Sequence, residues 1–180
     1  MHALRIAINI AWLVFWLYWL VAAADVKQRA AGQRRFPLTG VSVVAVLVLV
    51  RVVPGDGLAV HGPVLGAIGA VVFASGIGLA VWARLHLGRN WGMPRTEKAD
   101  PELVTSGPYR FVRHPVYSGL LLGLLGTALV TNLIGLILVA VVGAYFYYSA
   151  KVEERNLTAS FPEAYPEYQA ATKMLIPFVL

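Results

Sequence analysis

Five apolar runs separated by polar segments set the hydrophobic pattern of this 180-residue chain. They cover about residues 6–24, 38–53, 63–87, 116–130 and 133–148. Runs of this kind indicate helices that cross a hydrocarbon core of roughly 30 Å. The pattern therefore predicts an all-α integral membrane protein with five transmembrane helices, in a single multi-pass domain that spans residues 1–180.

The first run ends in Ala22, Ala23 and Ala24, and this triplet imitates the cleavage site of a signal peptide. The run is longer than the apolar region of a signal peptide, and Arg5 is the only basic residue before it. We therefore expect the first run to be retained as a transmembrane helix.

Small residues recur at close spacing in the third and fourth runs. They are Gly62, Gly66, Gly69, Ser75, Gly76 and Gly78 in the third run and Gly119, Gly123 and Gly126 in the fourth. Small side chains let two helix backbones approach closely, so we expect tight helix packing here. Thr131 and Asn132 leave only a minimal turn, which predicts an antiparallel hairpin of the fourth and fifth helices.

Beyond Ser149 the chain alternates charged residues with apolar ones near helical spacing. The apolar positions are Leu157, Phe161, Tyr165 and Tyr168. Pro162 and Pro166 interrupt this stretch, and proline removes a helical hydrogen bond and clashes with the preceding turn. We expect a tail of short helical pieces that lies along the membrane surface.

Basic residues outnumber acidic ones, 15 Lys and Arg against 9 Asp and Glu, in a chain that is 58% hydrophobic. All but Arg5 and Arg51 fall between the first two runs, around the segment between the third and fourth runs, or in the tail. With five spans these segments share one face, which the positive-inside rule assigns to the cytoplasm. We predict a prokaryotic cytoplasmic membrane with the N-terminus outside and the C-terminus cytoplasmic, and membrane lipids rather than nucleic acid as partners.

Polar side chains that could do chemistry gather in residues 103–117 (LVTSGPYRFVRHPVY) and in the pair Glu153 and Glu154. Pro108 and Pro115 bias the residues before them away from helix, so this stretch is predicted to be an irregular approach to the fourth span. Its Arg and His side chains offer donors to a carboxylate or a ribose. A carboxylate of the Glu pair could bind a positively charged cofactor.

Structural roles could explain the same residues without chemistry. Arg113 could anchor the topology at the interface, and Tyr109 could be an interfacial aromatic residue. The Glu pair could form ion pairs with Lys151, Arg155 or Arg113. The residue types alone leave both readings open.

Several reaction classes lack the residues that they need. The chain has no cysteine, which excludes disulfides, thiolate metal ligands and a cysteine nucleophile. Its histidines, His2, His61, His86 and His114, are not spaced as metal ligands, so no metal site is predicted. His86 is interpreted as an interfacial residue. Neither a phosphate-cradling loop nor a nucleophile elbow is present.

Three stretches resemble the isoprenylcysteine carboxyl methyltransferase family of membrane enzymes. They are WARLHLGRNW, LVTSGPYRFVRHPVYSG and EERNLTASFPEAYPEY, within about the last 100 residues. The motif is specific, because RHP-x-Y is followed one span later by paired Glu and then by F-P-E-x-Y. The resemblance implies a methyltransferase that uses S-adenosylmethionine and releases S-adenosylhomocysteine.

The resemblance also implies a cytosolic cofactor pocket formed by the segment before helix four, the end of helix five and the tail. Residues 1–87 then supply the first three spans, and residues 88–180 form the cofactor-binding catalytic portion. The implied cofactor-binding residues are Leu103, Val104, Gly107, Tyr109, His114, Pro115, Tyr117 and Glu153. The implied catalytic residues are Arg113 and Glu154, and the implied substrate-binding residues are Ser149, Asn90 and Trp91.

Two positions depart from the eukaryotic members of this family. Ser149 stands where they carry an arginine credited with recognising the substrate carboxylate, and Pro94 or Arg95 stands where they carry a glutamine. The predicted acceptor is therefore the carboxylate or thiol of a lipid-like or small apolar molecule. Two other classes stay open: a sterol-reductase-like enzyme that binds NADPH, and a non-enzymatic membrane protein that retains the fold.

Overall fold

The computed structural model of the protein describes residues 2–24, 62–88 and 103–177. Within them the chain forms α1 (His2–Ala24), α3 (Pro63–Leu87), the 3₁₀ helix η3 (Gly107–Arg110), α4 (Pro115–Thr131), α5 (Gly135–Ser160) and α6 (Ala164–Ala171). The described residues form no strand, and Val112 and Lys173 are joined by an isolated bridge. The predicted helical class is confirmed for this part of the chain.

Three of the described helices, α1, α3 and α5, are long and apolar enough to cross a membrane, and α4 is a shorter apolar helix. Large apolar side chains such as Leu13, Val71 and Ile137 point outward on these helices. Such a surface is suited to lipid rather than water. The predicted run at residues 38–53 lies outside the described residues, so the count of five spans stays a prediction.

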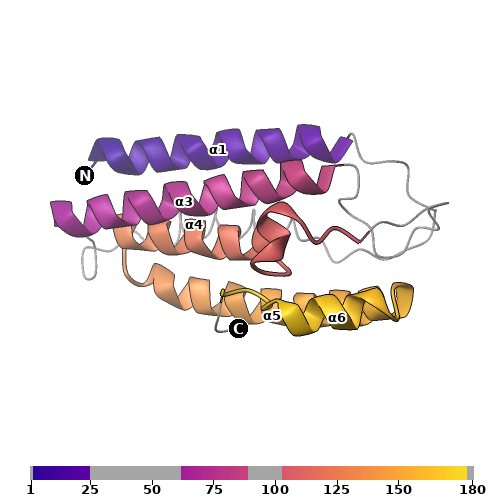
Figure 1. The fold of residues 1–180 in the computed structure, drawn as a ribbon. Helices are drawn as coiled ribbons and strands as arrows, with labels where there is room; N and C mark the ends of the chain where they lie inside the picture. Colours follow the sequence, from indigo (N-terminus) through magenta and orange to yellow (C-terminus); the bar gives the residue numbers. More distant parts are fainter. Residues whose placement is uncertain (1, 25–61, 89–102, 178–180) are drawn as a thin grey trace.

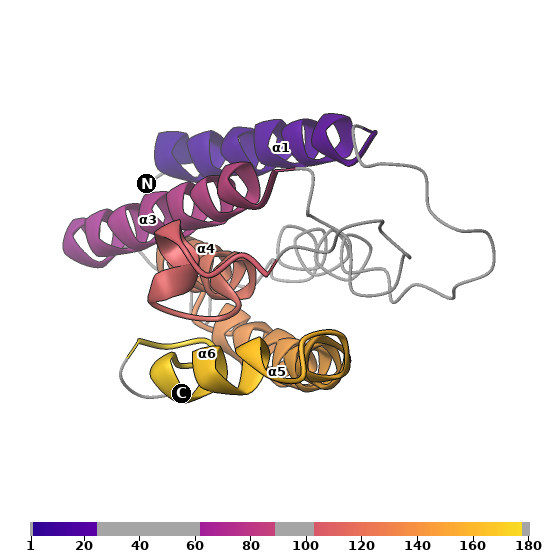
Figure 2. The ribbon, with the colours of Figure 1, turned by 45° about the vertical axis from the view of Figure 1, so that its right-hand side comes forward.

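The helices are layered in the order α1, α3, α4 and α5, with α6 beside α5 (Figures 1 and 2). Arg84 near the end of α3 donates to the carbonyl oxygen of Ala22 near the end of α1, over 2.6 Å. Arg5 near the start of α1 donates to the carbonyl oxygen of Val130 near the end of α4, over 3.4 Å. Helices α1 and α3 are therefore parallel, and α4 runs in the opposite direction.

Glycine lets the backbones of α3 and α4 touch. A β-carbon at Gly119 would lie 2.6 Å from the carbonyl oxygen of Gly76, closer than real β-carbons come to such an atom. The predicted tight packing is confirmed for these two glycines. Gly62 and Gly78 face open space and take no part in this contact.

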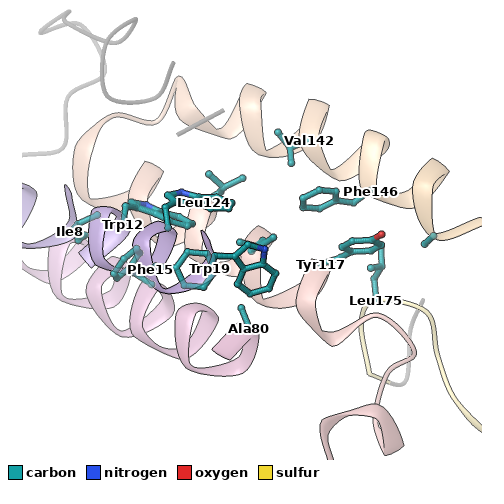
Figure 3. Close-up of a cluster of buried hydrophobic side chains, with 14 of the residues drawn as sticks. Ile8, Trp12, Phe15, Trp19, Ala80, Tyr117, Leu124, Val142, Phe146 and Leu175 are labelled. Atoms are coloured by element: carbon teal, nitrogen blue, oxygen red, sulfur yellow. The ribbon is translucent and has the colours of Figure 1, made fainter. Parts of the chain in front are cut away.

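Aromatic side chains of α1 cover the α3 and α4 pair (Figure 3). Trp12, Phe15 and Trp19 are buried, and their rings pack against one another. Trp12 also donates its indole N–H to the hydroxyl of Thr127 on α4, over 3.0 Å. A buried indole needs such a partner, so this bond fixes the position of α1 against α4.

The hairpin predicted for the fourth and fifth runs is present. Asn132 follows the last residue of α4, and its side-chain oxygen accepts the backbone N–H of Ile134 over 2.9 Å. The backbone N–H of Gly135, the first residue of α5, then bonds to the carbonyl oxygen of Asn132 over 3.0 Å. These bonds satisfy main-chain groups at the tip of the hairpin.

The tail is more helical than predicted. Helix α5 continues past the predicted end of the fifth run to Ser160, because residues 150–160 contain neither glycine nor proline. Pro162 follows that helix, as expected, whereas Pro166 is the third residue of α6, where its missing N–H costs no helical hydrogen bond. The tail folds back toward the start of α4, and its predicted place on the membrane surface stays a prediction.

Candidate active site

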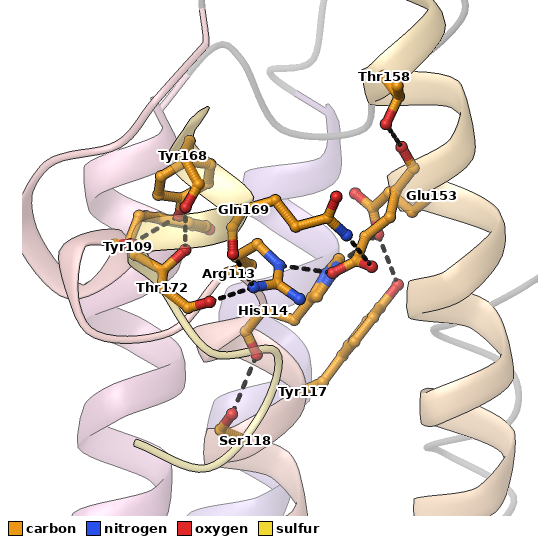
Figure 4. A network of polar contacts seen from close by, with 11 residues as sticks. Tyr109, Arg113, His114, Tyr117, Ser118, Glu153, Thr158, Tyr168, Gln169 and Thr172 are labelled. Atoms are coloured by element: carbon orange, nitrogen blue, oxygen red, sulfur yellow. Dashed lines mark hydrogen bonds and ion pairs between the residues drawn. The ribbon is translucent and has the colours of Figure 1, made fainter. Parts of the chain in front are cut away.

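A polar cluster lies where the start of α4, the end of α5 and the tail meet (Figure 4). Pro115 is the first residue of α4, and His114 before it has φ −124° and ψ 61°, outside the helical region. A proline disfavours the helical conformation for its predecessor. The chain therefore turns at His114, and Arg113 and His114 face α5, as the irregular approach predicted.

Arg113 joins three elements through its guanidinium group. Its Nε donates to Oε1 of Glu154 on α5 over 2.6 Å. Its Nη1 donates to the carbonyl oxygens of Gln169 and Thr172 at the end of α6. Both partners of the ion pair are at least nine-tenths buried, so the charges compensate each other away from water.

Main-chain hydrogen bonds hold the tail against the start of α4. The backbone N–H of Arg113 bonds to the carbonyl oxygen of Lys173 over 2.8 Å, and that of His114 bonds to Met174 over 3.0 Å. The hydroxyl of Ser118 donates to the carbonyl oxygen of Leu175 over 2.5 Å. The tail is thus an integral wall of the cluster.

His114 lies between the two glutamates. Its Nδ1 is 3.6 Å from Oε2 of Glu153, and its Nε2 is 3.5 Å from Oε1 of Glu154. Nε2 makes no hydrogen bond within the described residues, so the second distance is a close contact only. The imidazole stacks on Tyr117, which stacks in turn on Phe146, and these rings hold its orientation.

The two glutamates differ in exposure and in partners. The side chain of Glu153 is 37% exposed and that of Glu154 is 5% exposed. Tyr117 donates its hydroxyl to Oε2 of Glu153 over 3.0 Å. Arg113 neutralises the charge of Glu154. The carboxylate of Glu153 is therefore the negative charge that remains on the exposed side of the cluster.

Two tyrosines beside the cluster stay neutral. Burial, followed by the charge of Glu153, raises the pKa of Tyr109. Burial likewise raises the pKa of Tyr168 to about 12, although Arg113 acts in the opposite direction. The hydroxyl of Tyr168 donates to the carbonyl oxygen of Tyr109 over 2.6 Å, a bond that requires the protonated phenol.

The structure brings five of the predicted site residues together: Arg113, His114, Tyr117, Glu153 and Glu154. Tyr109 joins them through Tyr168, and Pro115 is buried at the first turn of α4. Their assigned roles in catalysis and cofactor binding stay predictions.

The other predicted site residues lie around this cluster or outside the described residues. Leu103 and Val104 are half-buried on the segment before η3, and Gly107 packs against α3. Ser149 is half-buried on α5, one turn before Glu153. Asn90 and Trp91 lie outside the described residues.

Sequence reasoning missed several residues that build the cluster. Gln169 donates its side-chain amide to Oε2 of Glu154 over 3.1 Å, and the carbonyl group of Thr172 accepts from Arg113. Phe146 was one apolar residue among many in the fifth run. Gln169 is one of the polar residues that follow F-P-E-x-Y, so its place after the motif could have marked it as a member of the cluster. No sequence pattern marks a main-chain carbonyl group as a partner.

Other parts of the described structure offer less to a charged ligand. Among the described residues, no group of three His, Cys, Asp or Glu side chains could hold a metal ion. An apolar groove of about 690 Å³ lies between α1 and α3 and is lined by Ala7, Ile10, Ala11, Val14, Phe15, Tyr18, Ile77 and Val81. It has no charged side chain, so the polar cluster is the better candidate for a cofactor.

Comparison with known proteins points to the same region. A model of the phospholipid methyltransferase family matches residues 64–164, from the start of α3 to the start of α6. The cobalt-zinc-cadmium resistance protein CzcN of Cupriavidus metallidurans is 35% identical over 94 residues, which are 51% of this chain and 43% of that protein.

Two similar proteins are named as methyltransferases. Methanethiol S-methyltransferase 1 of Bradyrhizobium diazoefficiens is 34% identical over 83 residues, 46% of this chain and 28% of that protein. Protein-S-isoprenylcysteine O-methyltransferase B of Arabidopsis thaliana is 39% identical over 80 residues, 43% of this chain and 41% of that protein. The chain thus spans less than half the length of these relatives. The family match and these names confirm the resemblance predicted from its C-terminal motifs.

Proposed function

Because this chain belongs to the phospholipid methyltransferase family, we propose that it transfers a methyl group from S-adenosylmethionine to the carboxylate or thiol of a lipid-like or small apolar acceptor. The observation that carries this proposal is the environment of Glu153. It is a partly exposed carboxylate, held by Tyr117, beside a pair of charges that neutralise each other. Such a group suits a cationic cofactor.

The residues around Glu153 fit S-adenosylmethionine in charge and in character. Glu153 would accept hydrogen bonds from its ammonium group or its ribose hydroxyl groups. The other residues that would line the pocket are Leu103, Val104, Gly107, Tyr109, His114, Pro115 and Tyr117. When bound, the cofactor would supply an electrophilic methyl group. A carboxylate or thiolate already carries the attacking lone pair and needs little acid or base catalysis, whereas a thiol would first release its proton to water.

Arg113 and Glu154 contribute to this reaction by holding the site together. Their buried pair fixes the tail, and the tail in turn shields the cluster from water. Orientation of two reactants can lower a barrier by roughly 7 to 11 kcal/mol. Methyl transfer by positioning to an acceptor that is already deprotonated therefore requires only the groups that this cluster contains.

The acceptor that we favour is a thiol or a neutral group rather than a carboxylate. Ser149 cannot pair with a carboxylate as an arginine can. Two of the three cations that could replace that arginine, Arg113, Lys151 and Arg155, have other partners. Arg113 is engaged by Glu154 and the end of α6, and Lys151 lies over the ring of Tyr147 at 5.7 Å. The name of the Bradyrhizobium relative, methanethiol S-methyltransferase, agrees with a thiol acceptor.

Calorimetric titration of the detergent-purified protein with S-adenosylhomocysteine and with NADPH tests this proposal. We expect S-adenosylhomocysteine to bind and NADPH not to bind, because a phosphate group beside Glu153 would be repelled. Binding of NADPH alone would favour the reductase class, and binding of neither would favour a non-enzymatic protein. At present two of the relatives described above carry methyltransferase names, and no observation favours the other two classes.

A further inference from the structure

His86, in the last turn of α3, lies directly against Gly107 of the predicted cofactor-binding segment. A β-carbon at position 107 would lie 2.6 Å from Cε1 of His86 and 2.7 Å from each of its ring nitrogens. Gly107 also has a φ of +59°, which disfavours any side chain. Only glycine therefore lets the imidazole ring approach the backbone of this segment so closely.

Two further contacts hold the same segment on α3. Nε2 of His86 is 2.8 Å from the hydroxyl oxygen of Ser106. The hydroxyl of Tyr109 donates to the carbonyl oxygen of Ala83 over 3.5 Å. Positions 83 and 86 are three residues apart and lie on one face of α3, so this face carries all three contacts.

The segment depends on these contacts for its position. Residues 103–106 have no helical structure, and η3 is a single 3₁₀ turn, so little local structure orients them. On the far side the tail holds Tyr109 through the hydroxyl of Tyr168. The segment is thus fixed between α3 and the tail.

We infer that His86 is a positioning residue for the cofactor-binding segment, because its imidazole ring fixes Ser106 and Gly107 against α3. The inference rests on the proposed function for the identity of the ligand. It assigns His86 no contact with the cofactor. Its effect is to limit the conformations of residues 103–110 before any ligand arrives, which lowers the entropy cost of binding.

Hydrogen–deuterium exchange and calorimetry on three variants test the inference. In His86→Ala without ligand, we expect faster amide exchange in residues 103–110, with α4 and α5 unchanged. We also expect affinity for S-adenosylhomocysteine to fall roughly two- to tenfold, the equivalent of one hydrogen bond. His86→Gln can still reach Ser106 and should recover part of both effects. The control Leu85→Ala, at the neighbouring position of the same turn and exposed like His86, should change neither.

The two proposals fail in different ways. Unchanged exchange in residues 103–110 of His86→Ala would overturn the role of His86, whether or not the wild type binds S-adenosylhomocysteine. Faster exchange throughout α3 and α4 would also overturn it, because His86 would then support the fold in general. Failure of the wild type to bind S-adenosylhomocysteine, with faster exchange confined to residues 103–110 in the variant, would overturn the proposed function but keep His86 as the residue that fixes this segment.

Discussion

At the scale of single residues, Glu153 and Glu154 are adjacent in sequence but have different hydrogen-bond partners. Successive positions on a helix point about 100° apart, so the two carboxylates reach different hydrogen-bond partners, although both lie close to His114. Glu154 turns toward Arg113 and the tail, and Glu153 turns toward Tyr117 and the open side of the cluster. The same substitution should therefore have a different effect at each position.

Glu153→Gln should weaken cofactor binding and leave the fold intact. It removes a charge-assisted hydrogen bond worth on the order of 1.5 to 3 kcal/mol, or roughly a ten- to hundredfold loss of affinity. Calorimetric titration with S-adenosylhomocysteine measures this loss. Glu167→Gln, at an exposed position on α6, is the control. Unchanged affinity in a folded Glu153→Gln protein would leave Glu153 with a structural role alone.

Glu154→Gln should instead destabilise the protein. It leaves the buried guanidinium group of Arg113 without its counter-charge, and breaking a buried pair in this way costs about 3 to 5 kcal/mol. The midpoint of thermal unfolding in detergent should fall clearly below that of Glu153→Gln. Equal midpoints for the two variants would contradict the structural division between the glutamates.

Ser149→Arg should change the preference for the acceptor. Ser149 lies one turn before Glu153 on α5, so an arginine there would border the predicted acceptor site and could pair with a carboxylate. We expect the wild type to methylate isoprenylated cysteine analogues poorly and the variant to turn them over faster, with small thiols favoured by the wild type. Transfer of label from S-adenosylmethionine measures both. Efficient carboxyl methylation by the wild type would show that the arginine is dispensable.

At the scale of secondary-structure elements, the close contact of α3 with α4 positions the site. Helix α3 carries the groups that hold residues 106–109, and α4 begins with the residues of the polar cluster. Any separation of these helices would move one part of the site away from the other. The glycines between them therefore affect function through distance as well as through stability.

Gly126→Ala should destabilise this contact, whereas Gly78→Ala should not. A β-carbon at Gly126 would lie 2.6 Å from the carbonyl oxygen of Gly69, and overpacking of this kind costs typically 1 to 3 kcal/mol. A β-carbon at Gly78 meets nothing within 4 Å. Thermal unfolding of the two variants in detergent compares them. A Gly126→Ala protein as stable as the Gly78→Ala control would show that the helices can move apart at little cost.

At the scale of the whole molecule, the start of α4 and the ends of α1, α3 and α5 lie toward one end, and the α4–α5 turn lies toward the other (Figure 1). Because α1 and α3 run parallel, the end of α1 and the start of α3 lie at opposite ends of the molecule, and one more membrane crossing would join them. The predicted run at residues 38–53 is the sequence feature that could do so. We propose the five-span topology, with the cluster at the cytoplasmic face, on this basis.

Single cysteines test this orientation, since the natural chain has none. Glu163→Cys, at an exposed position between α5 and α6, should be shielded from an impermeant thiol reagent in intact cells and should react after permeabilisation. Ile134→Cys, 43% exposed in the α4–α5 turn, should react in intact cells. The reverse pattern would place the cluster outside the cell.

The pattern of apolar residues was sufficient to predict four of the described helices, the hairpin of α4 and α5, and the close packing of α3 on α4. Hydrophobic runs, turn residues and small side chains act on their immediate neighbourhood, so their effect can be read locally. The end of α5 was harder to place. The last turns of α5 are charged, so the hydrophobic pattern assigns them to a separate tail. They contain no residue that breaks a helix, and the helix continues through them.

The sequence by itself determined the membrane class and the family motif, and it located the residues able to do chemistry. Only the tertiary structure decided their partners. Arg113 could have paired with either glutamate, and His86 was interpreted only as an interfacial residue. The acceptors at the end of α6 are main-chain carbonyl groups, which every residue possesses. Such choices depend on the directions in which packed helices point their side chains, and these directions follow from contacts between residues far apart in the chain.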